Sequence, residues 1–104
     1  MREFVGYVGP PEIHDAVIER VDLGPDVLVV GLRTDFGRGP ALRIEFDQPS
    51  AIDQHRAVGM TLYALAELSS ENGRRRFQFV NWEEIDDARL ELEATAVRWP
   101  TVEG

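Results

Sequence analysis

The sequence predicts a mainly β protein, a single-domain antiparallel sandwich or bent barrel of about six to seven strands with at most one or two short helices. Apolar and polar residues alternate with a period of two in residues 42–47 and 89–97, and this period places alternate side chains on opposite faces of a strand. Turn-forming residues, Gly-Pro-Asp at 24–26 and Asn-Gly at 72–73, separate such segments. Such short connections favour hairpins over βαβ crossovers.

The first half of the chain predicts a short strand, a hairpin and a further strand. The Gly-Pro-Pro triplet at 9–11 ends the first apolar run, because proline removes backbone donors. Residues 27–32 are apolar at every position, which predicts a central strand covered on both faces. Arg20 and Asp22 indicate one exposed face for the preceding strand. The strands of this half are expected at residues 4–8, 16–23, 27–34 and 42–47.

The second half is less uniform. Residues 50–58 fit either a short helix with a capping box or an irregular strand, and this alternative stays open. Residues 59–70 fit period two but are rich in helix formers. The Asn-Gly pair that follows favours a strand there, because a two-residue hairpin needs a strand on each side. Residues 75–80 and 89–97 supply the last two strands.

Length and composition exclude several classes of protein. The chain has 104 residues, 43% of them hydrophobic, and a net charge of −8, which suits one domain spanning residues 1–104 with a single core. An excess of acidic residues argues against binding to nucleic acid or anionic membranes, since both need clustered basic side chains. The sequence has no cysteine, no signal-peptide pattern and no apolar run that could cross a bilayer. We expect a cytoplasmic protein without a cofactor.

No residue pattern predicts catalysis or a metal site. The His14-Asp15 pair could contribute metal ligands, but His55 is the only other histidine, and local bonding to the backbone is the expected role. The serines lie in no nucleophile-elbow sequence. Adjacent carboxylates are abundant and therefore carry little information about glycoside hydrolysis. We expect no catalytic and no metal-binding residues.

Charge points instead to an interaction surface. Residues 81–104 hold seven acidic residues and two arginines, so −5 of the total −8 lies there. The triplet Arg74-Arg75-Arg76 follows the Asn-Gly turn and is expected to form a charged hairpin rim. An acidic patch can steer and bind a basic protein partner. The candidate interaction residues are His14, Asp15, Tyr63, Arg75, Trp82, Glu83, Glu84, Asp86 and Asp87.

Four stretches of the sequence stand out: EIHDA at 12–16, GMTLYALAE at 59–67, RFQFVNW at 76–82 and LELEA at 90–94. In these stretches and their order the sequence resembles a family of small uncharacterised bacterial proteins. The resemblance covers most of residues 4–97 and supports a strand rather than a helix at 59–67; it implies no catalytic residues. More loosely, a small, acidic, cysteine-free β protein is similar to immunity proteins of bacterial toxin systems.

Two functions remain open. The first is a non-catalytic module that binds another protein or itself, as a homodimer, through an exposed sheet face or edge. The second is a small-molecule-binding protein or enzyme with a pocket near His14, Tyr63 and Trp82. In the second case both histidines and a carboxylate should converge on one pocket.

Overall fold

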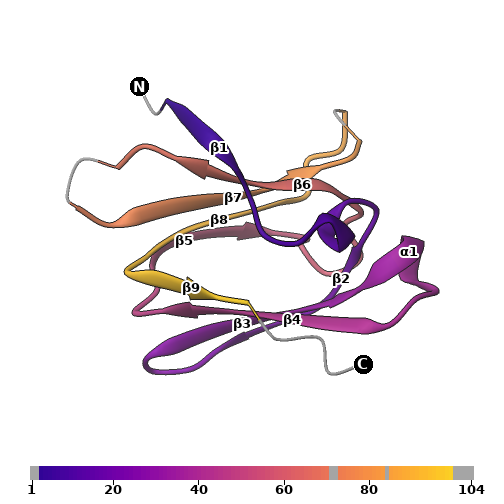
Figure 1. Cartoon of the computed structure of the whole chain (residues 1–104), viewed down its shortest axis with the longest axis horizontal. Coiled ribbons are helices and arrows are strands. Elements are labelled where there is room, and N and C mark those ends of the chain that lie inside the picture. The colour runs from indigo at the N-terminus through magenta and orange to yellow at the C-terminus, as the bar shows by residue number, and fades with distance from the viewer. Residues whose placement is uncertain (1–2, 71–72, 84, 100–104) are drawn as a thin grey trace.

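The chain folds into two antiparallel sheets that face each other (Figure 1), and the predicted mainly β class is confirmed. The computed structural model describes residues 3–70, 73–83 and 85–99. The five-stranded sheet has the order β1 (Phe4–Val8), β6 (Leu62–Leu68), β7 (Arg75–Asn81), β8 (Arg89–Ala94) and β5 (Ser50–His55). The four-stranded sheet has the order β2 (Val17–Leu23), β3 (Val27–Arg33), β4 (Ala41–Asp47) and β9 (Ala96–Arg98).

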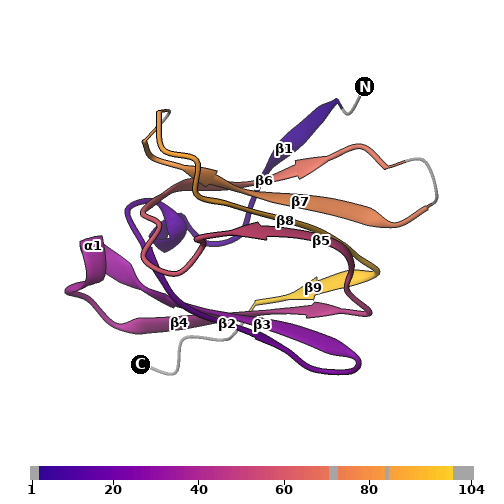
Figure 2. The same cartoon turned by 180° about the vertical axis from the view of Figure 1, so that it is seen from behind.

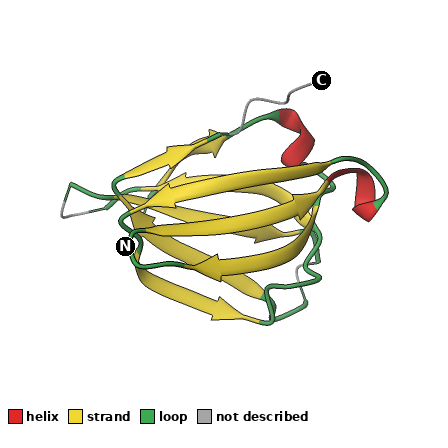
Figure 3. Ribbon diagram, turned by 90° about the horizontal axis from the view of Figure 1, so that it is seen from below, coloured by secondary structure: helices red, strands yellow, loops and turns green. Residues whose placement is uncertain are grey.

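Two short helical segments, η1 (Pro11–Ile13) and α1 (Thr34–Gly37), lie at the same end of the sandwich (Figure 3). Neither is more than one turn long. In the described part of the chain, no helix has the length and apolar character needed to cross a membrane.

The structure has nine strands rather than the six to seven expected, for two reasons. Residues 50–58, for which a helix and a strand were both considered, contain a strand, β5. The segment expected as one strand at 89–97 divides at Thr95, where the chain passes from the five-stranded to the four-stranded sheet. The Thr95 backbone N–H and hydroxyl both donate to the Asp47 carbonyl, at 2.9 and 3.2 Å, which holds this corner.

Period-two patterning builds the core. Leu42, Ile44 and Phe46 alternate along β4 and are all buried. The Phe46 ring meets those of Phe77 and Phe79 on the opposite sheet, at centroid distances of 5.1 and 5.8 Å. One apolar cluster therefore joins the two sheets.

The β2–β3 turn and the pairing of β6 with β7 are confirmed. The register of β6 and β7 does not fit a two-residue turn at 72–73, because Leu68 pairs with Arg76, whereas such a turn would pair it with Phe77. The Gly24 N–H donates to the Val27 carbonyl at 2.9 Å, which closes the β2–β3 turn. Strands β6 and β7 pair as the segment at 59–70 predicted. Asn72 lies outside the described residues, and Gly73 has a φ of +76°.

Strand β3 is central, between β2 and β4, but a second layer covers only one of its faces, contrary to expectation. On the outer face Val27 and Val29 are half-buried. A Cβ added to Gly31 would lie 2.8 Å from the Arg20 side chain, so the stem of Arg20 covers that position. The outer face of the apolar segment 27–32 is therefore covered in part by the long side chain of Arg20 on the neighbouring strand, and not by a second layer.

Backbone pairing also joins the two sheets along one side, which Figure 2 shows from behind. Val17, at the start of β2, forms an antiparallel bridge with Thr61, just before β6. The Asp15 N–H donates to the Leu62 carbonyl at 2.9 Å, and the Leu62 N–H donates to the Ala16 carbonyl at 2.8 Å. These bonds place the His14-Asp15 pair beside the first residues of β6.

Replacing Gly9 by alanine is expected to lower the free energy of unfolding by about 2–4 kcal/mol, from backbone strain and overpacking together. Gly9 has a φ of +91°, and an added Cβ would lie 2.5 Å from Ile13 and 2.8 Å from the Trp99 ring. Gly59→Ala is the matched control, because its φ is +95° but nothing lies within 4 Å; it should cost about 1 kcal/mol. Equal losses in urea unfolding would show that the contacts with Ile13 and Trp99 contribute nothing.

Candidate functional site

Four of the predicted site residues lie together at one end of the sandwich: His14, Asp15, Tyr63 and Trp82. His14 follows η1, whose turn is closed by bonds to the Pro10 and Pro11 carbonyls and anchored by the buried Ile13 side chain. Tyr63 lies in β6 and the other three lie in connecting segments, so their convergence comes from backbone bonds between segments distant in sequence.

One ring nitrogen of His14 is committed within the protein. Nδ1 lies 2.7 Å from the Tyr63 carbonyl oxygen, and because a carbonyl only accepts, Nδ1 donates the proton. Nε2 lies 3.4 Å from Oδ1 of Asp15. That oxygen is buried and has no hydrogen-bond partner. In the neutral imidazole Nε2 carries the lone pair, so the bond to Tyr63 fixes the orientation of the ring and leaves Nε2 as an acceptor beside the carboxylate.

Tyr63 and Trp82 are aimed outward by irregularities at the ends of their strands. The β6–β7 pairing shifts register between Leu62 and Ala64, which leaves Tyr63 as an extra residue, and such bulges re-aim a side chain. Trp82 directly follows β7, and its backbone N–H donates to the Thr61 carbonyl at 2.9 Å. The two ring centroids lie 6.0 Å apart.

The rings continue beyond these residues into a connected surface, which we call the aromatic surface: Phe4, Tyr7, His14, Phe36, Tyr63 and Trp82. Its five Phe, Tyr and Trp residues are 45% to 61% exposed. Centroid distances are 4.9 Å for Phe4–Tyr7, 6.1 Å for Tyr7–Tyr63, 5.4 Å for Tyr63–His14, 5.3 Å for His14–Trp82 and 6.3 Å for Trp82–Phe36. A continuous exposed apolar patch of this kind is typical of an interaction site.

Phe36 is held in this surface by an unusual turn. Asp35 and Phe36 have φ values of +50° and +53°, in the left-handed region that costs L-residues about 1–2 kcal/mol each. The Phe36 N–H donates to the Asp15 carbonyl at 2.7 Å, so α1 is tied to the residue that follows His14. Strained backbone maintained by surrounding contacts is a feature of functional sites.

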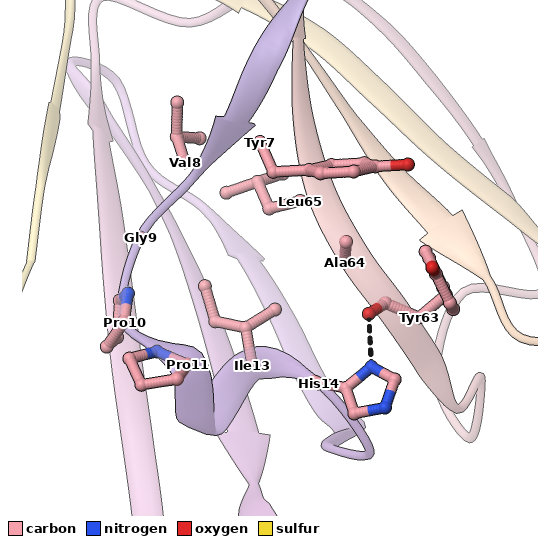
Figure 4. Close-up of a pocket in the computed structure, with 10 residues that line it drawn as sticks. All are labelled: Tyr7, Val8, Gly9, Pro10, Pro11, Ile13, His14, Tyr63, Ala64 and Leu65. Carbon is pink, nitrogen blue, oxygen red and sulfur yellow. Dashed lines mark hydrogen bonds between the residues drawn. The ribbon is translucent and has the colours of Figure 1, made fainter.

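A groove of about 260 Å³ lies against this surface (Figure 4). Tyr7 lies on one side, Pro10 and Pro11 lie on the other, and the apolar side chains of Ile13, Ala64 and Leu65 also line it. His14 and Tyr63 also line it, whereas Trp82 and His55 do not. The structure thus gives a groove near His14 and Tyr63, but the two histidines do not converge on it.

The described acidic residues among the predicted site residues 83–87 do not line the groove, and two of them pair with other side chains. Asp86 accepts a hydrogen bond from Asn81 Nδ2 at 3.1 Å. Asp87 pairs with Arg56 at 2.8 Å and with His55 at 3.1 Å. Glu83 is exposed directly after Trp82, and Glu84 lies outside the described residues.

The arginine triplet does not form the exposed rim that was expected. Arg75, at the opposite end of β7 from Trp82, makes two hydrogen bonds to Glu67, at 3.1 and 2.8 Å. Arg76 is only 4% exposed and pairs with Glu91 at 2.6 Å and Glu93 at 3.5 Å. The prediction of a solvated rim is wrong for Arg76, because cross-strand carboxylates on β8 enclose its guanidinium.

Most of the described acidic residues in 81–104 pair with arginines, so the excess negative charge of this segment is largely compensated. The carboxylates without an arginine partner lie mostly elsewhere in the chain. Each of the ten described arginines has a carboxylate or carbonyl partner. Five described carboxylates pair with no described arginine. Four of them are next in sequence to a residue of the aromatic surface or the groove, and the fifth, Asp26, lies in the β2–β3 turn. The four are Glu3, Glu12, Asp15 and Glu83.

The sheet edges are poorly suited to adding another strand. Strands β1, β2 and β5 each contain a register shift, and β9 is three residues long. Bulges and short edge strands both disfavour edge-to-edge pairing. Among the described strands, the exposed face around the aromatic surface is therefore a better docking site than any edge.

Sequence reasoning missed Phe4, Tyr7 and Phe36. Phe4 and Tyr7 lie on a strand short enough to be read as core, and their exposure depends on the register shift in β1. Phe36 lies in a loop whose composition gives no direction for its side chain. The sequence feature that could have indicated this surface is the pair Phe4 and Tyr7, two aromatic residues three positions apart in an edge strand.

The described residues contain no group of three or more His, Asp or Glu side chains that could hold a metal ion. Comparison with protein-family models, curated proteins and solved structures finds no match to this chain. The function must therefore be argued from the geometry of the chain itself.

Protonation of Asp86 is expected to destabilise the protein in acid. The hydrogen bond from Asn81 is the main cause that lowers the pKa of this carboxyl below its usual range, with help from the Ala88 N–H and Arg56. A lowered folded-state pKa contributes stability above the unfolded pKa, which is lost as pH falls through the folded value. Asp86→Asn should therefore reduce stability in urea at neutral pH and become indistinguishable from wild type below the folded pKa. A difference that persists unchanged in strong acid would contradict this.

Proposed function

We propose that this protein is a non-catalytic interaction module that binds a basic partner protein through the aromatic surface. The observation that carries the proposal is the position of the uncompensated carboxylates: Glu12, Asp15 and Glu83 adjoin exposed rings or the groove. Exposed aromatic side chains supply contact area at low entropic cost. Adjacent negative charge speeds association with a positively charged partner and selects against acidic ones.

The chemistry of the site supports binding over catalysis. Nδ1 of His14 is committed to the Tyr63 carbonyl, and the described residues that line the groove include no carboxylate that could act together with this histidine. His55 is engaged by Asp87 away from the groove. An immunity-like role, in which the basic partner is a toxin domain, stays a prediction.

The test is capture of basic proteins from a bacterial lysate by the immobilised protein, at low and high salt. We expect the double variant Glu12→Gln with Glu83→Gln to lose most of the protein captured at low salt, because both unpaired charges are removed. Tyr63→Ala with Trp82→Ala should abolish capture at either salt concentration.

The matched control is Asp26→Asn, which removes an unpaired carboxylate in the β2–β3 turn and should leave capture unchanged. The proposal fails if Asp26→Asn reduces capture as much as the double charge variant, or if the double aromatic variant, shown to be folded, captures the same proteins as wild type.

A further inference from the structure

We infer that the aromatic surface and its groove bind an extended, proline-containing basic segment in the polyproline II conformation. The inference rests on the proposed function, because it names the part of the basic partner that docks. Three features carry it: the shape of the groove, the unpartnered hydrogen-bond donors around it, and the charge at its border.

The groove suits a narrow, ridged, apolar ligand. It is open and about 260 Å³ in volume, and it is lined by the Tyr7 ring, by Pro10 and Pro11, and by apolar side chains that include Ile13, Ala64 and Leu65 (Figure 4). The Tyr7 and Tyr63 rings are inclined to each other by 69°, so they form ridges rather than one flat platform. Proline rings pack between such aromatic ridges, and their backbone is already extended before it binds.

The donors of the groove and of the aromatic surface beside it match a backbone whose carbonyls are free. Tyr7 and Tyr63 line the groove, and Trp82 lies outside it, with its ring centroid 6.0 Å from that of Tyr63. Within the described chain, the two tyrosine hydroxyls and the Trp82 indole N–H have no hydrogen-bond partner. A polyproline II segment has no internal hydrogen bonds and presents its carbonyl oxygens outward. A helix satisfies its carbonyls internally, and an added strand needs a regular sheet edge, which β1 does not offer because of its register shift.

The acidic residues beside the groove and the aromatic surface favour a ligand that carries positive charge. Glu12 lies between Pro11 and Ile13, two residues of the groove, and Glu83 follows Trp82. Neither pairs with a described arginine. Arginine or lysine side chains spaced between prolines would reach these carboxylates and the exposed ring faces, where cation–π attraction adds to the ion pairing.

The test compares three fluorescent peptides of equal length, built from repeated Arg-Pro-Pro, Arg-Gly-Gly or Glu-Pro-Pro triplets, by anisotropy. We expect the Arg-Pro-Pro peptide to bind about tenfold more tightly than the Arg-Gly-Gly peptide, because its backbone is preorganised. The Glu-Pro-Pro peptide should not bind. Tyr63→Phe, which removes only the hydroxyl donor, should weaken binding of the Arg-Pro-Pro peptide several-fold. Tyr63→Ala should weaken it by about tenfold or more.

Val58→Ala is the control, since Val58 is 58% exposed but lies outside the aromatic surface, and it should bind as wild type does. Equal affinity for the Arg-Pro-Pro and Arg-Gly-Gly peptides would overturn the inference and leave the proposed function standing. So would failure of all three peptides while lysate capture still depends on Glu12, Glu83, Tyr63 and Trp82. Preference for the Glu-Pro-Pro peptide would overturn both, as would failure of the peptides together with capture that is independent of this surface.

Discussion

Replacing Phe46 by alanine is expected to lower the free energy of unfolding by about 3–5 kcal/mol, the largest effect of any single change in the core. Phe46 is fully buried on β4, and its ring is the direct contact between the two sheets through Phe77 and Phe79. Alanine removes the apolar area and leaves a cavity that two sheets held by backbone bonding cannot close. The measurement is urea unfolding followed by tryptophan fluorescence.

The matched control is Phe4→Ala, because Phe4 is 56% exposed and should cost less than about 1 kcal/mol. Phe46→Leu keeps most of the volume and should fall between the two. If Phe46→Ala and Phe4→Ala have equal effects, the packing of the two sheets described here is wrong.

Replacing Arg76 by alanine is expected to cost about 3–5 kcal/mol, because it breaks a largely buried ion pair. The Arg76 side chain is 5% exposed, and those of Glu91 and Glu93 are 18% and 16% exposed. The matched control is Arg89→Ala, whose pair with Asp53 is about half exposed on both sides and should contribute about 1 kcal/mol or less.

A second variant separates the ion pair from the packing of its side chains. Nε of Arg76 is buried without a hydrogen-bond partner, so the network is incompletely satisfied and an uncharged replacement is tolerable. Arg76→Met combined with Glu91→Gln and Glu93→Gln should recover most of the stability lost in Arg76→Ala. A triple variant as unstable as the single one would show that the loss comes from packing and not from the broken ion pair.

Local patterns were sufficient for most of the fold. Alternation identified β4, β6 and β8, and the Asn-Gly pair at 72–73 indicated β7. The glycine-containing turn at 24–26 identified the β2–β3 hairpin. The break at Thr95 could not be predicted, because period two continues through it and only the bond to Asp47 reveals the change of sheet. The position of Gly31 is covered by the side chain of Arg20 from the neighbouring strand. This contact between strands could not be predicted from the composition of either segment.

The candidate site was predictable in part. His14, Tyr63 and Trp82 were singled out from the sequence and lie within ring contact of one another. The weight given to the acidic residues 83–87 was not matched by the structure, since Asp86 and Asp87 pair with Arg56. Net charge along a segment does not show which carboxylates have partners, because those partners come from strands distant in sequence.

The sheet order also sets when the aromatic surface can form during synthesis. Strand β1 leaves the ribosome first, yet it pairs only with β6, whose own partner β7 comes later still. Until then Phe4 and Tyr7 belong to an unpaired apolar segment of the nascent chain, and pairing of such long sequence separation is slow. The aromatic surface therefore stays incomplete until Trp82, which follows β7, has been synthesised, and a chain that ends before β7 cannot present it.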